Sequence, residues 1–147
     1  MLKITIVAVG KLKEKFWKEA CQEYLKRLSA YAKVSICELP DSNKEKEAAA
    51  ILEVLPEKDP VLLLDIKGKE LSSEQLSEKI DSYSLYGASH LVFIVGGSDG
   101  VTNEIKKRAT QCISFGPITL PHNLARVVLL EQIYRAFKIS RKEPYHK

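Results

Sequence analysis

The sequence predicts a single-domain α/β protein with a parallel sheet and helices on both faces. Two continuous apolar segments, residues 61–65 and 91–95, are typical of strands buried on both faces of such a sheet. A third short apolar strand spans residues 4–9, and strand and helix patterns alternate along the chain. Successive strand–helix units of this length imply right-handed crossovers that place helices on both faces. The 147 residues are enough for one domain with a hydrophobic core.

The first half of the chain predicts two strand–helix units. The strand at 4–9 ends at Gly10, and a helix with an aromatic and apolar stripe from Trp17 to Tyr31 follows. The turn between them is basic, with Lys11, Lys13, Lys15 and Lys18. We expect the stripe to be core and the lysines to be solvated, although they flank the sheet edge where ligands bind. Residues 34–39 alternate like a half-buried strand, and Ser42 with Glu45 has the spacing of a capping box for a helix to about Leu55.

The second half continues the alternation. The strand at 61–65 leads into a turn at Lys67-Gly68-Lys69, and Ser72 with Gln75 predicts a capped helix that stops at Gly87. The strand at 91–95 is followed by the glycine-rich loop 96–100, and a short helix begins at Thr102. The last strand is expected at 112–115.

A long apolar helix from about Leu124 to Ile139 organises the C-terminal part, with Pro121 in its first turn. It is apolar nearly all round, which indicates a buried helix. At 100° per residue His122 and Arg126 share one face, and a charged set shares the opposite one: Glu131, Arg135 and Lys138. This pattern predicts two packing partners for the helix, one being its own sheet and the other a second subunit in a homodimer.

Composition bounds the function classes. A net charge of +4 is a mild bias toward an anionic partner. The three cysteines, Cys21, Cys37 and Cys112, have no metal-ligand spacing, which favours a reduced, cytoplasmic location and no bound metal. No apolar run approaches the roughly 20 residues that span a membrane, and the N-terminus has the pattern of a strand rather than of a signal peptide. We therefore expect no membrane partner.

Three loops are candidates for ligand binding because they follow the strands at their carboxyl ends. They are residues 64–69, 96–100 and 115–120. The glycine loop matches neither G-x-G-x-x-G nor a Walker A motif, and taken alone it is typical of a tight strand-to-helix turn. No catalytic triad or histidine pair with metal spacing is present, and His90 at a strand start favours a structural role. The pattern indicates chemistry without a metal or a covalent intermediate.

Three stretches together resemble the SPOUT superfamily of α/β-knotted methyltransferases. They are VGGSDG, ISFGPITLPHNLARVVLLEQIYRA and the terminal PYHK, and the resemblance covers the whole chain from residue 3. Within the superfamily it points to small bacterial enzymes that methylate N3 of a pseudouridine in large-subunit (23S) ribosomal RNA, with the assembled ribosome as substrate. It implies one domain over residues 1–147, a trefoil knot at about 95–139 and a catalytic, RNA-contacting tail at 141–147.

The resemblance also implies a site for S-adenosyl-L-methionine in the knot loops. Carried over by position, the cofactor contacts Leu64, Gly96, Phe115, Gly116, Pro117, Ile118, Thr119 and Leu120. The residues themselves agree with this chemistry, since glycines permit close backbone approach and loop N–H and C=O groups can read an adenine edge. Leu64, Ile118 and Leu120 offer apolar walls.

Loss of the N3 proton needs an acceptor, and the polar candidates lie near the knot and the tail. They are His122, Arg126, Tyr134, Tyr145 and His146. Arg126 could hold a phosphate or stabilise negative charge on the base, or instead form an ion pair at a subunit contact. Tyr145 could stack on the target base. His146 could serve the reaction or belong to a disordered tail.

Two other functions remain open from the sequence. One is a non-catalytic α/β module that binds RNA or nucleotides and assists ribosome assembly. The other is a related knotted methyltransferase that acts on transfer RNA. Methyl transfer from S-adenosylmethionine to ribosomes that lack the modification distinguishes both from the first hypothesis.

Overall fold

The computed structural model describes residues 1–146 as one five-stranded sheet with five helices. All strand pairs in the sheet are parallel, and the order is β2-β1-β4-β3-β5. The strands are β1 (Lys3–Val9), β2 (Lys33–Leu39), β3 (Val61–Glu70), β4 (His90–Val95) and β5 (Gln111–Ser114). The helices are α1 (Lys15–Leu28), α2 (Lys44–Val54), α3 (Ser73–Leu85), α4 (Asn103–Arg108) and α5 (His122–Ser140).

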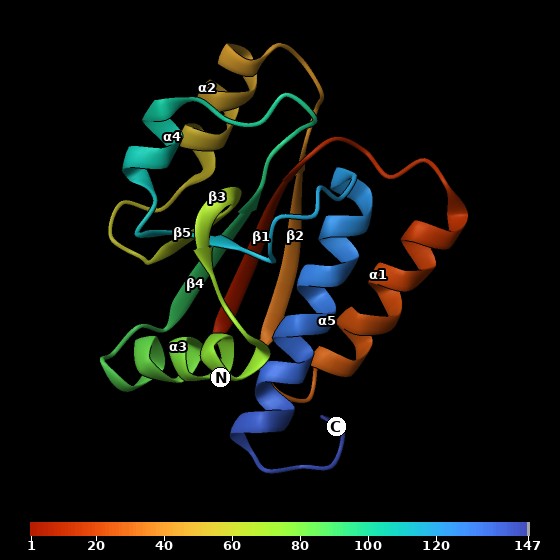
Figure 1. The fold of residues 1–147 in the computed structure, drawn as a ribbon, viewed down its shortest axis with the longest axis vertical. Coiled ribbons are helices and arrows are strands. Elements are labelled where there is room, and N and C mark those ends of the chain that lie inside the picture. Colours follow the sequence, from red (N-terminus) through yellow and green to blue (C-terminus); the bar gives the residue numbers. More distant parts are fainter. Residues whose placement is uncertain (147) are drawn as a thin grey trace.

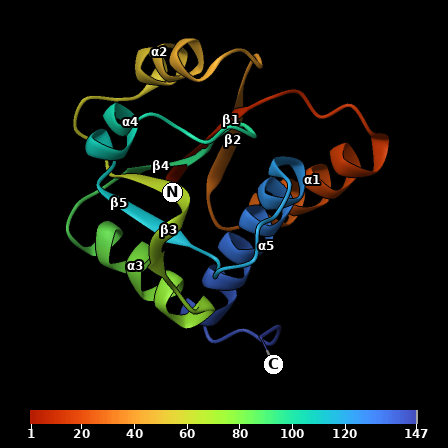
Figure 2. The same ribbon diagram turned by 45° about the horizontal axis from the view of Figure 1, so that its top comes forward.

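The helices form a layer on each face of the sheet (Figures 1 and 2). Helices α1, α3 and α5 cover one face, where Phe93 of the central strand β4 belongs to the larger core cluster. Helices α2 and α4 cover the other, where Val92 and Ile94 belong to a smaller cluster. All but the first residue of β4 are buried, which is why that strand lacks a polar alternation. The predicted α/β class, parallel sheet and two helical layers are confirmed.

Helix capping follows the sequence prediction in α3 and differs from it in α2. In α3 the Ser72 hydroxyl accepts from the Gln75 N–H, and the Gln75 side chain accepts from the Ser72 N–H. In α2 the cap is Asn43, whose side chain accepts from the Lys46 N–H, so the capping box predicted at Ser42 was wrong by one residue. The Ser42 N–H instead donates to the buried Glu47 carboxylate.

The turn predicted at 67–69 was also wrong, because β3 continues to Glu70. Residues 62–64 pair with β5, the register then slips, and pairing resumes at Lys69 and Glu70. The intervening residues form a bulge in which a Cβ on Gly68 would lie 2.6 Å from the Cys112 carbonyl carbon. Only glycine allows this close approach of two backbones. The bulge turns Asp65 and Ile66 toward the carboxyl edge of the sheet, where they line the pocket described below.

Within residues 1–146, no helix is long and apolar enough to cross a membrane. The same residues contain no cluster of three His, Cys, Asp or Glu side chains that could hold a metal ion. The domain limits, the knot at 95–139 and the functional tail at 141–147 stay predictions.

Candidate active site

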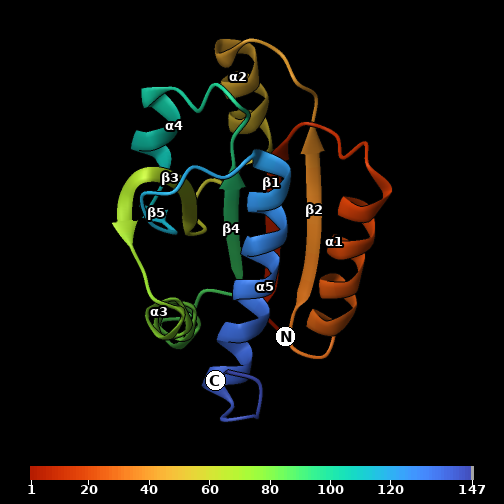
Figure 3. The ribbon, with the colours of Figure 1, turned by 45° about the vertical axis from the view of Figure 1, so that its right-hand side comes forward.

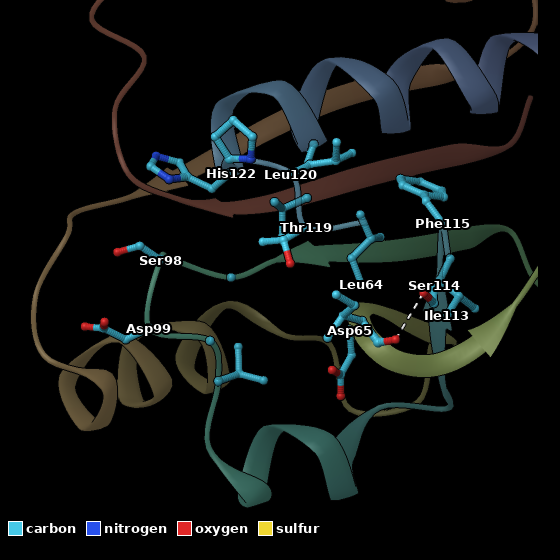
Figure 4. Close-up of a pocket in the computed structure, with 18 of the residues that line it drawn as sticks. Leu64, Asp65, Ser98, Asp99, Ile113, Ser114, Phe115, Thr119, Leu120 and His122 are labelled. Carbon is cyan, nitrogen blue, oxygen red and sulfur yellow. Dashed lines mark hydrogen bonds between the residues drawn. The ribbon is translucent and has the colours of Figure 1, made fainter. Parts of the chain in front are cut away.

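A pocket of about 550 Å³ lies at the carboxyl edge of the sheet. Its walls come from the β3 bulge, the glycine loop after β4, the loop after β5 and the first turn of α5 (Figure 4). This volume lies within the roughly 300–1,000 Å³ of small-molecule sites. The three loops that the sequence singled out therefore meet around one cavity. Seven of the eight residues assigned to the cofactor line it, and the eighth, Pro117, belongs to the same loop.

Ser114 at the end of β5 ties two walls of the pocket together. Its hydroxyl donates to the Ile66 carbonyl of the bulge, at 3.2 Å, and accepts from the Gly116 N–H at 3.0 Å. Figure 4 draws a hydrogen bond of Ser114 as a dashed line beside Asp65. Asp65 itself forms an ion pair of 3.7 Å with Lys106 of α4. Because Ser114 is buried, the spacing between the bulge and the last loop is set from inside the protein.

The glycine loop packs tightly at its start. A Cβ on Gly96 would lie 2.8 Å from a methyl group of Val101, and a Cβ on Gly97 would lie 2.9 Å from the Glu47 carboxylate. The loop is closed by a hydrogen bond from the Gly100 N–H to the Gly97 carbonyl. Close packing therefore disfavours a side chain at both glycines, and this packing explains their presence without a ligand. What the structure adds is the position of the loop on the pocket wall, with Ser98 and Asp99 among the lining residues.

The loop after β5 has main-chain groups available for a ligand. Gly116 adopts φ +112°, a left-handed conformation that side chains disfavour, and a Cβ there would meet nothing within 4 Å. Among residues 1–146, the N–H groups of Ile118, Thr119 and Leu120 have no hydrogen-bond partner. The Ile118 side chain is 77% exposed. An apolar side chain beside free N–H donors in an open pocket is the environment that a planar heterocycle fills.

His122, at the start of α5, lines the same pocket. Its Nε2 lies 3.2 Å from the position that a Cβ on Gly10 would occupy, and the Asp41 carboxylate approaches that position to the same distance. His122 and Asp41 therefore face one another across Gly10 at the end of β1. A histidine in this place can exchange a proton with a group in the pocket.

Arg126 does not line the pocket, although it is one helical turn from His122. Its guanidinium is 1% exposed and donates to the Glu38 carboxylate at 2.5 Å and to the Gly10 carbonyl at 2.7 Å. Its Nε has no hydrogen-bond partner within the described residues. Arg126 thus forms an ion pair inside the chain and holds the first turns of α5 against the ends of β1 and β2.

The tail lies at the other end of α5, on the same chain. The Tyr145 hydroxyl donates to Glu131 at 2.9 Å, and the Tyr145 ring packs edge-on against Tyr134 and under the Arg135 guanidinium. His146 contacts Arg135 and Glu74. Neither tail residue lines the pocket of its own chain. Burial, followed by the hydrogen bond to Glu131, raises the pKa of Tyr145 to about 12.

The structure thus brings together the cofactor candidates and His122, and it separates Arg126, Tyr145 and His146 from them. Lys147, the last residue of the RNA-contacting tail expected at 141–147, lies outside the described residues. Sequence reasoning missed Lys44 and Lys106 on the pocket wall, and it assigned no role to the other polar lining residues, Asp65, Ser98, Asp99 and Ser114. Asp65 and Ser114 each end an apolar strand segment, and Ser98, Asp99 and Ser114 lie within the stretches VGGSDG and ISFGPITL, whereas no motif indicated Lys44 or Lys106.

This fold and pocket define a class, the α/β proteins that bind a small ligand at the carboxyl ends of parallel strands. A family model described as "Predicted SPOUT methyltransferase" matches residues 2–146. The chain is 48% identical to Ribosomal RNA large subunit methyltransferase H of Bacillus cytotoxicus and 47% identical to the protein of that name of Bacillus thuringiensis. Each alignment covers 99% of this chain and all of the relative. The chain belongs to the SPOUT methyltransferase family.

A solved structure shows a related fold. It is a probable methylase family protein from Haemophilus influenzae Rd KW20, with a TM-score of 0.56 and 12% sequence identity. The match covers 95% of this chain and 66% of that one, so this chain spans about two thirds of its length. At this identity the comparison concerns the arrangement of strands and helices alone.

Proposed function

We propose that this protein transfers the methyl group of S-adenosylmethionine to N3 of a pseudouridine in 23S ribosomal RNA. The observation that carries the proposal is the pocket at the carboxyl edge, with free main-chain donors at 118–120, in a chain of this family. The full-length similarity to relatives named Ribosomal RNA large subunit methyltransferase H supports large-subunit RNA as the substrate. We expect a cytoplasmic enzyme, because ribosomes are there.

The pocket fits S-adenosylmethionine by its chemistry. The unpaired N–H groups at 118–120 can donate to adenine nitrogens, with Leu64, Ile118 and Leu120 as apolar contacts to the ring. Asp65 and Asp99 place negative charge on the walls of a pocket whose ligand carries a sulfonium and an ammonium group. When bound, the cofactor supplies an already activated methyl group, so the protein's main contribution is alignment in a dry site.

The proton at N3 of the base must leave during the reaction, and His122 is our candidate to accept it. It is the one histidine that lines the pocket within the described residues, and Asp41 lies nearby to stabilise its protonated form. Tyr145, with a pKa of about 12, stays protonated at neutral pH and serves as a hydrogen-bond donor or a stacking surface. Arg126 acts as a positioning residue, because Glu38 and Gly10 occupy its guanidinium.

The tail completes the site only if two chains associate. Leu124, Val128, Glu131 and Arg135 follow one another at i, i+4, i+7 and i+11, so they lie on one face of α5. Leu124 and Val128 are half-buried and do not pack in either core cluster. Two copies that pair these faces in antiparallel fashion bring the tail on Glu131 and Arg135 toward the partner's pocket. We propose that Tyr145 and His146 act on the partner's bound RNA in such a homodimer.

The test is transfer of tritium from labelled S-adenosylmethionine to ribosomes from a strain that lacks the modification. We expect label at one pseudouridine of the 23S RNA and none on already modified ribosomes. Label on transfer RNA instead would favour a related knotted methyltransferase that acts on transfer RNA. Binding of the cofactor without any transfer would favour a non-catalytic assembly factor.

A further inference from the structure

Residues 11–18, with the sequence KLKEKFWK, form an exposed basic and aromatic surface beside the pocket, which we call the lysine apron. Its four lysines are exposed, and the segment contains one acidic residue, Glu14. Leu12 between two of them is 5% exposed, so it anchors the loop and leaves Lys11 and Lys13 pointing outward. Only Lys15 of the four has an ion-pair partner within residues 1–146, Glu19 on the next turn.

The lysines of the apron work against local helix stability. Helix α1, like α5, has no acidic residue in its first turn and no side-chain cap, whereas α2, α3 and α4 each begin with at least one glutamate in the first turn. Lys15 and Lys18 instead lie where the helix dipole disfavours cations. Lys15 is compensated by Glu19, but Lys18 has no ion-pair partner within residues 1–146, and a local rule broken in this way points to function.

Phe16 gives the apron an aromatic surface. Its side chain is 61% exposed, and its ring lies 4.9 Å from that of Trp17 at a tilt of 54°. Trp17 packs against the larger core cluster and so supports Phe16 from below. A single exposed phenylalanine is ordinary, but here lysines flank it on both sides in the sequence. Cations for phosphates together with a ring for a base are what a single nucleic-acid strand binds.

The apron lies next to the pocket. Lys11 directly follows Gly10, where an added Cβ would lie 3.2 Å from Nε2 of His122 on the pocket wall. Figure 3 shows the segment between β1 and α1 crossing the same end of the sheet as the first turn of α5. RNA with one base in the pocket therefore reaches the apron with its neighbouring nucleotides.

We infer that the lysine apron binds the unpaired nucleotides that flank the target base, with Phe16 stacking on one base and Lys11 and Lys13 contacting phosphates. The inference rests on the proposed function and adds the RNA contact surface to it. An unpaired strand fits better than a duplex, because a base must be free to stack on Phe16.

Three variants test this surface through methyl transfer to unmodified ribosomes. Lys11→Gln/Lys13→Gln removes the two charges, and Phe16→Ala removes the ring. Lys3→Gln/Lys33→Gln is the matched control. These two lysines are exposed and pair in register at the N-terminal ends of β1 and β2, the sheet edge opposite to the pocket. All variants should bind S-adenosylmethionine as the wild type does, by calorimetry.

We expect the KM for ribosomes to rise at least about fivefold in both apron variants and to stay unchanged in the control. The slope of log KM against log salt concentration should become shallower by about 1.4 in the double lysine variant, since each single-strand phosphate contact contributes about 0.7. Phe16→Trp should retain the wild-type KM, whereas Phe16→Leu, which is apolar but cannot stack, should resemble Phe16→Ala. Wild-type KM and salt dependence in the apron variants would overturn the inference while leaving the proposed function intact.

Two further outcomes are separated by direct measurements. If Phe16→Ala converts a dimer to a monomer in sedimentation, the surface belongs to a second copy of the chain and the RNA contact is wrong. If the wild type transfers no methyl group, the proposed function fails. The RNA affinity of the apron is then measured directly, by fluorescence anisotropy with a single-stranded RNA of about 12 nucleotides. Equal anisotropy for wild type and apron variants overturns the inference in that case.

Discussion

His122 and Arg126 are four residues apart on α5 and have different surroundings. The helical period predicts that they share a face, and both do lie toward the carboxyl ends of the strands. His122 lines the pocket, whereas the longer Arg126 side chain reaches Glu38 and Gly10 under the helix. Periodicity gives the direction of a side chain but not the residue that meets it, because its partners come from β1 and β2, more than eighty residues earlier. The role of Arg126 therefore needed the structure.

At Gly116, replacement by alanine should weaken cofactor binding. The left-handed φ of +112° strains any side chain by roughly 1–2 kcal/mol, so the loop at 115–120 is expected to shift its main-chain donors. Gly87 is a matched control, because it also has a positive φ, +96°, and open space at its Cβ, but follows α3 away from the pocket. Gly116→Ala and Gly87→Ala should lose similar thermal stability, and only the first should lose at least tenfold in affinity by calorimetry, about 1.4 kcal/mol. Equal affinity in both variants would remove the loop from the cofactor site.

At Tyr145, replacing Glu131 by glutamine should lower the tyrosine pKa from about 12 toward its ordinary value of 10.0. Burial would remain, but the charged acceptor that favours the protonated hydroxyl would be gone. Because the folded-state pKa is the higher one, the stability from this contact is complete below pH 10 and is lost as pH rises through about 12. Tyrosinate absorbance, with Tyr145→Phe to identify the signal, measures the shift. An unchanged titration in Glu131→Gln would mean that the hydroxyl does not contact Glu131 in solution.

At the scale of elements, the sequence predicted all five strands and all five helices of the described residues. The predicted end of a strand was wrong where pairing with a distant segment sets that end. Residues 61–65 and 91–95 were recognisable because burial on both faces leaves no polar alternation. The continuation of β3 to Glu70 was not, because it depends on pairing with Ile113 and Ser114 across a bulge. The pocket depends on distant segments in the same way. The sequence identified each of its three loops, but only the structure shows that they line one cavity.

For α5, the dimer proposal predicts opposite effects at two neighbouring valines. Val128→Glu alters the face that lacks core contacts, so it should give a folded monomer in sedimentation with little change in Tm. Val127 packs against the larger core cluster, so Val127→Glu places a charge in the core and should lower stability by several kcal/mol. A wild-type chain that is monomeric at micromolar concentration would refute the dimer, whatever the variants do.

On the scale of the whole molecule, the pocket is lined by the first turn of α5, whereas the chain leaves the other end of that helix and folds back onto Glu131 and Arg135 (Figure 1). Glu131 and Arg135, which hold the tail, lie about 14–20 Å along α5 from His122, and neither Tyr145 nor His146 lines the pocket of its own chain. The division of labour that we propose follows from this distance, with the sheet edge for the cofactor and the tail for the partner's RNA.

Deleting residues 145–147 should therefore leave dimerisation and cofactor affinity nearly unchanged. Methyl transfer should fall at least about 100-fold, the scale expected when positioning or proton-transfer groups are lost. Mixing the truncated chain with a chain carrying Gly116→Ala should restore part of the activity, because one heterodimer pocket then has both an intact loop and an intact partner tail. Full activity in the truncated protein would exclude Tyr145 and His146 from the site.

The strand order has a consequence for how the protein is made. In the centre of the sheet, Lys3 of β1 pairs with His90 of β4. Strand β1 is synthesised first, so it cannot pair with β4 until most of the chain has left the ribosome. At about 5–20 residues per second this delay lasts several seconds, during which one edge of β1 is open to other chains. Helix α5, which supplies much of the larger core cluster, comes last of all. A nascent chain released before residue 122 lacks the α5 residues of the larger core cluster and one wall of the pocket, so we expect the cofactor to stabilise only chains that include α5.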